Sequence, residues 1–255
     1  MKRKEPVSNS SNPVAPKVYY PAFLNLKDTP TLTLPPRGGG KGGGESRYYP
    51  VFLNLKGKKA VVIGGGKVAE RKILALLKTG ADITVTSPEI TKKIEKEKLK
   101  GRIKHITRQY RKGDLKNAFL VIAATDYPAI NERVSKDALC LVNVVDTPDL
   151  CNFIVPSIMN RGLLNIAVSS SGISPALSRS IRKELEKLYG PEFAIYLNSL
   201  KTIRTEAIKT IKDKKKRGKF LKDIASEKMI RMLREKGSGE AKKVAEDLFR
   251  KVKVS

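Results

Sequence analysis

The sequence predicts an α/β protein in which a parallel, doubly wound sheet is followed by a small α+β region and a helical C-terminal region. Three observations predict this class. Short apolar, β-branched runs alternate with segments whose apolar residues recur at helical spacing. A turn of three glycines joins the first run to the first helix. From Pro191 the pattern is helical and basic, and residues 201–255 hold 19 Lys and Arg against 8 Asp and Glu.

The amino-acid composition limits the classes of protein to which this chain can belong. The 255 residues, 40% of them hydrophobic, suffice for one or two domains with a sizeable core. The formal net charge of +27 indicates an anionic partner: nucleic acid, an anionic membrane or an acidic small molecule. The sequence has neither an apolar run of about 18 residues nor the apolar segment of a signal peptide, so we expect a cytoplasmic protein. A single histidine rules out a His-based metal site, and the two separated cysteines favour reduced, structural thiols.

The first 47 residues are predicted to be a disordered, duplicated extension. Residues 19–27 recur as residues 48–56, and the only difference is Ala22 against Val51. A proline- and glycine-rich linker separates the two copies. We expect the second copy to dock at the start of the sheet and the first copy to be dispensable.

The predicted first strand, residues 61–63, runs directly into the glycine turn and a helix. In this order Gly64-x-Gly66-x-x-Ala69 is a dinucleotide-binding fingerprint of a Rossmann-type sheet. Gly64 permits the tight turn, Gly66 lets the backbone approach a pyrophosphate, and Ala69 allows close packing of the helix on the strand. The N-terminus of the helix adds free N–H groups and a partial positive charge. The alternative is a glycine-rich turn that binds nothing.

Four more strands are predicted at residues 83–86, 103–106, 119–126 and 141–146, with helices at residues 90–100 and 131–138. Parallel strands end at one edge of the sheet, where open α/β sheets bind ligands. That edge would carry Thr125, Asp126 and Asp146. After the second strand, Ser87 or Glu89 would contact the ribose in place of the usual acid at the strand end. The residues therefore specify the choice between NAD and NADP only weakly.

The pattern changes after the fifth strand. Residues 153–156 and 163–168 are predicted to be two further strands, joined around residues 160–162. A hydroxyl-rich loop follows, in which Ser174 is the expected helix N-cap and Pro175 the first helical residue. This loop would bind carboxylates or phosphate, or would simply cap the helix. The apolar stripe of that helix consists of Ala176, Leu177, Ile181, Leu185 and Leu188.

Four motifs in this order resemble one family over about residues 48–200. They are the cofactor turn at residues 62–72, the segment 123–126, the segment 143–157 and the loop at residues 166–179. They are similar to the motifs of the precorrin-2 dehydrogenase and sirohydrochlorin ferrochelatase module of siroheme synthases. The resemblance implies that NAD⁺ takes a hydride from precorrin-2 to give sirohydrochlorin. In bifunctional members the same cleft then inserts Fe²⁺ to give siroheme, and other members only dehydrogenate.

The resemblance also implies roles for individual residues. Asp146 would be the general base of dehydrogenation and the proton acceptor or metal guide of chelation, and the alternative is an Asp that caps the end of the strand. Ser170 would face the tetrapyrrole or be a modification site. The expected cofactor contacts are Gly64, Gly65, Gly66, Lys67, Val68, Ser87, Pro88, Glu89, Thr125 and Asp126. The expected substrate contacts are Asn152, Ser169, Ser170 and Ser171, and no protein metal site is expected.

These expectations divide the chain into four parts. They are an extension (1–47), an NAD-binding domain (48–150), a dimerisation and substrate-cleft region (151–190) and a basic helical region (191–255). The family is a homodimer, and a basic cleft suits its polycarboxylate substrate. The alternative, of another class, is a non-catalytic NAD-sensing module with a nucleic-acid-binding basic tail. Asp146 and the serine loop favour the enzyme, because a sensor needs neither.

Overall fold

A computed structural model describes residues 48–254 of the chain. The predicted duplicated extension, residues 1–47, lies outside the described residues. Among those described, no helix combines the length and the apolar character that a membrane crossing needs.

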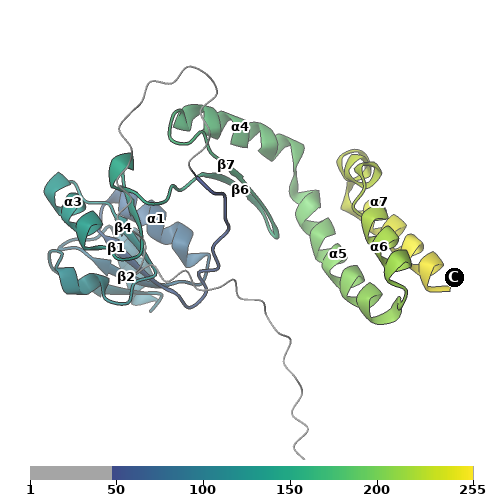
Figure 1. The fold of residues 1–255 in the computed structure, drawn as a ribbon, viewed down its shortest axis with the longest axis horizontal. Coiled ribbons are helices and arrows are strands. Elements are labelled where there is room, and N and C mark those ends of the chain that lie inside the picture. The colour runs from purple at the N-terminus through teal and green to yellow at the C-terminus, as the bar shows by residue number, and fades with distance from the viewer. Residues whose placement is uncertain (1–47, 255) are drawn as a thin grey trace, which may run out of the picture. The chain divides into compact units, whose positions relative to one another are not determined.

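The N-terminal part is a parallel sheet with helices packed against it (Figure 1). Its five strands lie in the order β3-β2-β1-β4-β5. This order confirms the predicted doubly wound sheet. Its strands are β1 (Lys59–Ile63), β2 (Asp82–Thr86), β3 (Ile103–Ile106), β4 (Leu120–Ala123) and β5 (Leu141–Val144). The helices between them are α1 (Lys67–Leu77), α2 (Lys92–Leu99) and α3 (Pro128–Asp137), with 3₁₀ turns η2 (Lys112–Leu115) and η3 (Pro148–Leu150).

The sheet is buried on both faces, which explains its continuous apolar strands. On one face Val62 packs with Ile73 of α1 and Ile94 of α2. On the other face Val61 packs with Val134 of α3 and with residues around η2. Strand β1 lies at the centre, paired with β2 and β4, so its carboxyl end is flanked by two neighbouring strand ends.

The region after β5 differs in part from the prediction. Residues 153–156 form no strand, and the hairpin instead pairs β6 (Ser157–Arg161) with β7 (Leu164–Val168). The chain before β6 is already bonded to β5, because the Asn152 amide donates to the Val142 carbonyl and the Asn143 side chain donates to the Phe153 carbonyl. Pro156 then lacks the N–H that a strand ladder requires. Of the predicted turn at residues 160–162, only Gly162 lies in the observed turn, with a φ of 60°, because Asn160 and Arg161 belong to β6.

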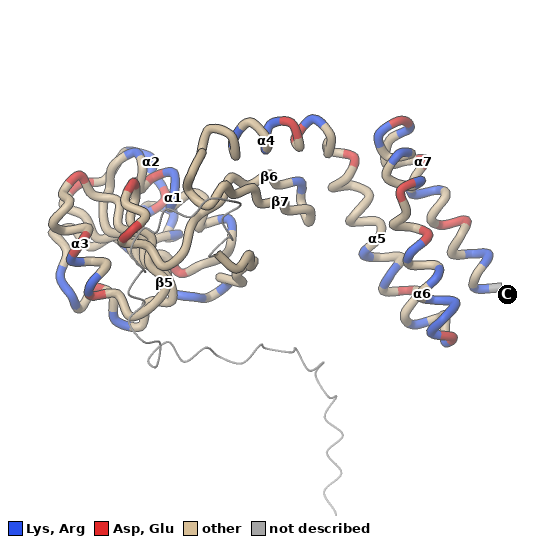
Figure 2. The backbone as a smooth tube through the Cα atoms, turned by 45° about the horizontal axis from the view of Figure 1, so that its top comes forward, with Lys and Arg blue, Asp and Glu red and all other residues tan. Residues whose placement is uncertain are grey.

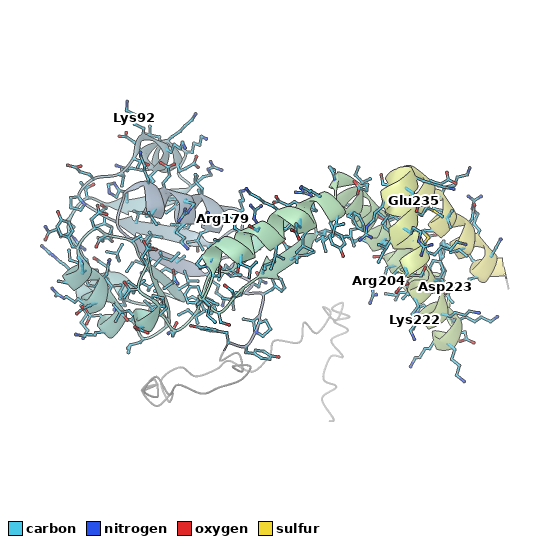
Figure 3. All side chains as sticks on the ribbon, turned by 90° about the horizontal axis from the view of Figure 1, so that it is seen from above. Lys92, Arg179, Arg204, Lys222, Asp223 and Glu235 are labelled. Atoms are coloured by element: carbon cyan, nitrogen blue, oxygen red, sulfur yellow. The ribbon has the colours of Figure 1, made fainter. Side chains whose placement is uncertain are left out.

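The C-terminal part is helical, as predicted. It comprises α4 (Pro175–Leu188), α5 (Pro191–Thr210), α6 (Lys214–Asp223) and α7 (Glu227–Val254), and Gly237 interrupts α7 with a φ of 79°. Helices α5, α6 and α7 share a core in which Phe220, Met229 and Tyr196 are buried. Lys and Arg recur along these helices, with Asp and Glu among them (Figure 2). Arg204 and Lys222 are exposed examples (Figure 3).

Candidate functional site

A pocket of about 480 Å³ opens at the carboxyl edge of the sheet. Four segments line it: the glycine turn after β1, residues 86–91 after β2, Gln109 and Tyr110 after β3, and residues 124–127 after β4. This is the edge where the strand pattern predicted ligand binding. Eight of the ten predicted cofactor residues line the pocket: Gly64, Gly65, Gly66, Ser87, Pro88, Glu89, Thr125 and Asp126. The other two, Lys67 and Val68, form the first turn of α1.

The glycine turn is shaped by contact with the neighbouring loops. A Cβ atom on Gly64, whose φ is 114°, would lie 2.2 Å from the carbonyl oxygen of Ala124. A Cβ atom on Gly65 would lie 1.9 Å from the carbonyl oxygen of Glu89. A Cβ atom on Gly66 would meet nothing within 4 Å. The first two glycines therefore allow the loops to pack, and the third leaves open space in front of the backbone.

Helix α1 begins at this open space. Gly66 is its N-cap residue, and no side chain caps the helix. The N–H groups of its first turn and the positive end of its dipole thus favour an anion here. Ala69 is fully buried, which agrees with the close packing predicted for the third fingerprint position.

The end of β2 adds a polar wall to the pocket. Ser87 is held on both sides, because its amide donates to the Ile106 carbonyl and its carbonyl lies 2.9 Å from Nε2 of His105. The hydroxyl of Thr86 is buried and has no hydrogen-bond partner among the described residues. A buried hydroxyl in a pocket wall without a partner fits a site that a polar ligand completes.

The loop after β4 is fixed by a residue that the sequence pattern did not reveal. Oδ1 of Asn131 in α3 accepts from the Thr125 hydroxyl at 2.8 Å, and Nδ2 of Asn131 donates to the Thr125 carbonyl at 2.9 Å. Thr125 therefore has a structural role at the pocket wall, and Asp126 beside it is exposed. No local motif marks Asn131, whose only signal is its place on the helix that follows the strand.

Asp146 lies apart from this pocket, in the turn after β5. Its φ is 59°, its side chain is exposed, and it is not among the residues that line the pocket. The thiol of Cys151 braces the turn: it accepts from the Val144 amide at 3.1 Å and lies 3.3 Å from the Thr147 carbonyl. Burial and the Arg71 charge lower the pKa of Lys72 in α1, and Cys151 and Asp146 oppose this shift, so Lys72 lies within electrostatic reach of the turn.

The serine loop is held by its own hydroxyls. Oγ of Ser170 accepts from the Ser174 amide at 2.9 Å and from the Ser178 hydroxyl at 3.1 Å. Oγ of Ser169 accepts from the Ser171 amide at 3.0 Å. Ser174 caps α4 as predicted, with its Oγ accepting from the Leu177 amide. Each hydroxyl that accepts in this way keeps a proton to donate, so the loop can still bind an anionic group.

Asn152, the other predicted substrate contact, is bonded to the sheet. Its Oδ1 accepts from the Val142 amide and its Nδ2 donates to the Cys140 carbonyl, both at 2.8 Å. The amide thus continues the hydrogen bonding along the edge of β5. This gives Asn152 a structural role beside any contact with substrate.

The fold and the pocket define a nicotinamide dinucleotide-binding protein of the α/β class. Residues 51–157 match the family model described as putative NAD(P)-binding, and residues 161–188 match the model of the central part of a sirohaem biosynthesis protein. The chain belongs to the precorrin-2 dehydrogenase and siroheme synthase family.

Individual relatives support this membership. The chain is 37% identical to the precorrin-2 dehydrogenase of Bacillus subtilis over 149 residues, which cover 58% of this chain and 92% of that protein. It is 46% identical to the siroheme synthase of Methylobacillus flagellatus over 134 residues, or 51% of this chain and 29% of that one. The chain spans about a third of the length of the siroheme synthases that it matches.

A solved structure shares the fold. The structure titled SirC, precorrin-2 dehydrogenase, superposes with a TM-score of 0.68 and 26% sequence identity. The superposition covers 82% of this chain and all of that one. The parallel sheet, the small antiparallel hairpin and the helical C-terminal part are therefore those of this family.

Proposed function

We propose that this chain is an NAD-dependent precorrin-2 dehydrogenase that forms sirohydrochlorin. One observation supports this most directly. The pocket combines an open glycine turn, an uncapped helix N-terminus and a buried hydroxyl that has no hydrogen-bond partner within residues 48–254, in a chain that spans 92% of a precorrin-2 dehydrogenase. When bound, NAD⁺ would accept the hydride that leaves the substrate.

Different residues of the pocket would bind different parts of the dinucleotide. The turn at Gly64, Gly65 and Gly66, with the amides of Lys67 and Val68, would hold the pyrophosphate at the start of α1. The segment after β2, with Ser87, Pro88 and Glu89, would face the adenosine ribose. Thr125 and Asp126 would border the cofactor where it crosses the end of β4.

The charge of the pocket favours NAD over NADP. Glu89 and Asp126 line it, and of the described residues that line it none is Lys or Arg. A 2′-phosphate is normally held by a cationic side chain, whereas a 2′-hydroxyl is held by an acid. Glu89 is therefore the proposed ribose contact, and NAD the proposed cofactor.

Asp146 is the proposed general base. Oxidation of precorrin-2 releases a hydride and a proton, and the exposed carboxylate of Asp146 would take the proton. The hydroxyls of Ser169, Ser170 and Ser171 and the amide of Asn152 would bind carboxylates of the substrate. The family membership and these groups favour the enzyme over a dinucleotide sensor with a nucleic-acid-binding tail.

Two further proposals concern partners. Fe²⁺ would be a second substrate if Asp146 also accepts the protons that the macrocycle loses on metal insertion. A homodimer would cover the apolar side chains of α4 and the hairpin, because Leu177 is 55% exposed, Leu163 55% and Ile158 49% in the single chain. Isolated apolar residues on a surface are ordinary, but a row of them on adjacent elements indicates an interface.

An anaerobic assay tests the function. Precorrin-2 is mixed with NAD⁺ or NADP⁺, and the absorbance of sirohydrochlorin is followed. We expect turnover with NAD⁺, and a fall in kcat of about 10²-fold or more for Asp146→Ala, because a general base contributes at least this much. Folded wild-type protein that gives no sirohydrochlorin refutes the proposal.

Chelation has its own assay, in which Fe²⁺ or Co²⁺ is added to sirohydrochlorin. Appearance of the metallated spectrum supports the second substrate. A spectrum that stays that of the metal-free macrocycle limits the chain to dehydrogenation.

A further inference from the structure

The loop between β3 and η2 forms a wall of the pocket to which the sequence pattern assigned no role. Gln109 and Tyr110 of this loop are among the residues that line the pocket. Gln109 is exposed and Tyr110 is buried. The loop carries no binding motif, and only its position after a strand of the parallel sheet connects it with the ligand.

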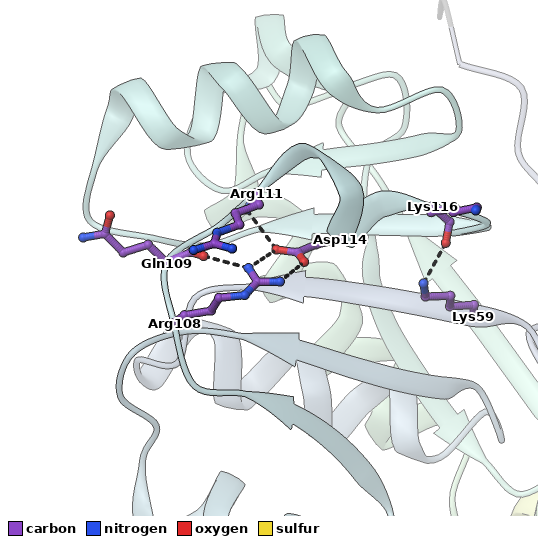
Figure 4. A network of polar contacts seen from close by, with 6 residues as sticks. All are labelled: Lys59, Arg108, Gln109, Arg111, Asp114 and Lys116. Atoms are coloured by element: carbon purple, nitrogen blue, oxygen red, sulfur yellow. Dashed lines mark hydrogen bonds and ion pairs between the residues drawn. The ribbon is translucent and has the colours of Figure 1, made fainter.

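One side of the loop is clamped by an ion pair. Nη1 and Nη2 of Arg108 donate to the two carboxylate oxygens of Asp114 at 2.9 and 2.6 Å (Figure 4). The same carboxylate accepts from the Arg111 amide at 2.9 Å, and Nη1 of Arg108 also donates to the Gln109 carbonyl at 2.9 Å. The side chain of Asp114 is 4% exposed and that of Arg108 is 34% exposed, so the carboxylate end of this two-pronged pair is shielded from water.

The other side of the loop is anchored by Tyr110. Its hydroxyl donates to Oδ2 of Asp137 in α3 at 2.9 Å, and the Arg133 guanidinium lies 5.9 Å from the centre of its ring. At the far end of η2, Nζ of Lys59 donates to the Lys116 carbonyl at 2.7 Å (Figure 4). The backbone around Gln109 is therefore held in place, and its side chain is exposed at the pocket.

The order of the strands indicates which part of the cofactor reaches this wall. The proposed pyrophosphate site follows β1 and the proposed ribose site follows β2, and β3 is the next strand outward. Moving along the dinucleotide from pyrophosphate through ribose leads to the base at the end of β3. An amide matches the edge of adenine, because it offers an acceptor for the exocyclic amine and a donor for a ring nitrogen.

We propose that Gln109 recognises the adenine base of the dinucleotide and that the Arg108–Asp114 pair positions it. This rests on the proposed function for the presence of a dinucleotide. It adds a residue that selects the base and a positioning pair that acts through the backbone of that residue. Neither role depends on the tetrapyrrole, so both can be examined by cofactor binding alone.

The experiment compares the affinities of the full chain for NAD⁺ and for 1,N6-etheno-NAD⁺, measured by titration. The etheno bridge removes the amine donor of adenine and blocks its ring nitrogen N1. We expect wild-type protein to prefer NAD⁺ by about tenfold, the difference that one or two hydrogen bonds provide. Gln109→Leu should bind both dinucleotides with nearly equal affinity, because the matched side chain is gone.

Further variants separate recognition from folding. Arg108→Ala should also reduce the preference, and Arg108→Lys should restore it only in part, because lysine lacks the planar fork of arginine. Arg102→Ala is the matched control, since Arg102 pairs with Glu97 outside the pocket and should keep the wild-type preference.

The outcomes are distinguishable. If Gln109→Leu keeps the preference for NAD⁺, or loses affinity for both dinucleotides equally, the assignment of Gln109 is wrong. If wild-type protein binds neither dinucleotide, the proposed function itself fails. If it binds NAD⁺ with the expected preference but does not oxidise precorrin-2, the base recognition stands and the proposed substrate does not.

Discussion

At the scale of single residues, the three glycines of the turn have different roles. The volumes that side chains at Gly64 and Gly65 would need are taken by carbonyl groups of other loops, whereas the volume beside Gly66 is open. In this fingerprint Gly64 and Gly65 are needed for the packing of the loops, whereas Gly66 leaves room for a ligand. A substitution series along the turn should separate them.

Gly64→Ala and Gly66→Ala form a matched pair of variants. The first forces a Cβ into the Ala124 carbonyl at a φ of 114°, so we expect the free energy of unfolding to fall by about 3 kcal/mol or more. The second should change it by less than about 1 kcal/mol and instead weaken NAD⁺ binding. Urea unfolding and cofactor titration measure the two effects. Equal losses of stability in both variants would contradict this division.

The contacts of Cys151 also indicate its role. Its thiol joins Val144 and Thr147 across the turn that carries Asp146, and burial raises the pKa of that thiol. The other cysteine, Cys140, is also half-buried, but its nearest acceptor is the Leu141 carbonyl at 3.7 Å, and burial raises its pKa to about 11. The two thiols therefore differ in their hydrogen bonds more than in their surroundings.

Cys151→Ala should lower kcat for precorrin-2 by about tenfold and leave the KM for NAD⁺ unchanged, because a lost hydrogen bond or two loosens the Asp146 turn. Cys151→Ser should recover part of the rate, since a hydroxyl can donate and accept in the same place. Cys140→Ala serves as the control and should behave as wild type. Identical kinetics for the two alanine variants would show that the brace does not position Asp146.

At the scale of elements, α4 is the clearest unpartnered surface. Its predicted apolar stripe exists, but Leu177, Ile181 and Leu188 remain 38% to 55% exposed in the single chain. The helix contacts the hairpin of β6 and β7, and both carry exposed apolar residues. This pairing of elements is what the proposed homodimer would bury.

Leu177→Glu should therefore convert the protein to a monomer, because a carboxylate in an apolar interface loses its hydration. Light scattering coupled to gel filtration measures the mass in solution. Leu99→Glu is the control, since Leu99 of α2 is 81% exposed and lies outside the proposed interface. A wild-type protein that is monomeric at all concentrations would refute the homodimer.

At the scale of the whole molecule, the sheet could be predicted from the sequence because each strand and helix has its own local pattern of apolar residues. The segment at residues 153–156 shows the limit: its apolar residues suggest a strand, but side-chain and backbone bonds to β5 and the missing N–H of Pro156 decide otherwise. The site shows the same limit. Gln109 and Asn131 have no motif, because their roles arise only when distant loops meet at the sheet edge.

The net charge of +27 is a property of all 255 residues taken together. A polycarboxylate substrate would be attracted by this field, and salt would weaken the attraction. We expect the KM for precorrin-2 to rise several-fold between about 0.05 and 0.5 M salt, and the KM for NAD⁺ to change less. Steady-state kinetics over this range test the idea. A larger salt effect on NAD⁺ than on precorrin-2 would contradict it.

The contacts of the glycine turn also constrain how the chain can change in length. The loops after β1, β2 and β4 interlock through the carbonyl groups of Ala124 and Glu89, so an insertion into any one of them would displace its neighbours. The turn between α2 and β3 has no such contact, because a Cβ atom on Gly101 would meet nothing within 4 Å. New sequence, such as an affinity tag or a fluorescent label, is therefore best accommodated at Gly101, on the edge of the sheet remote from the pocket.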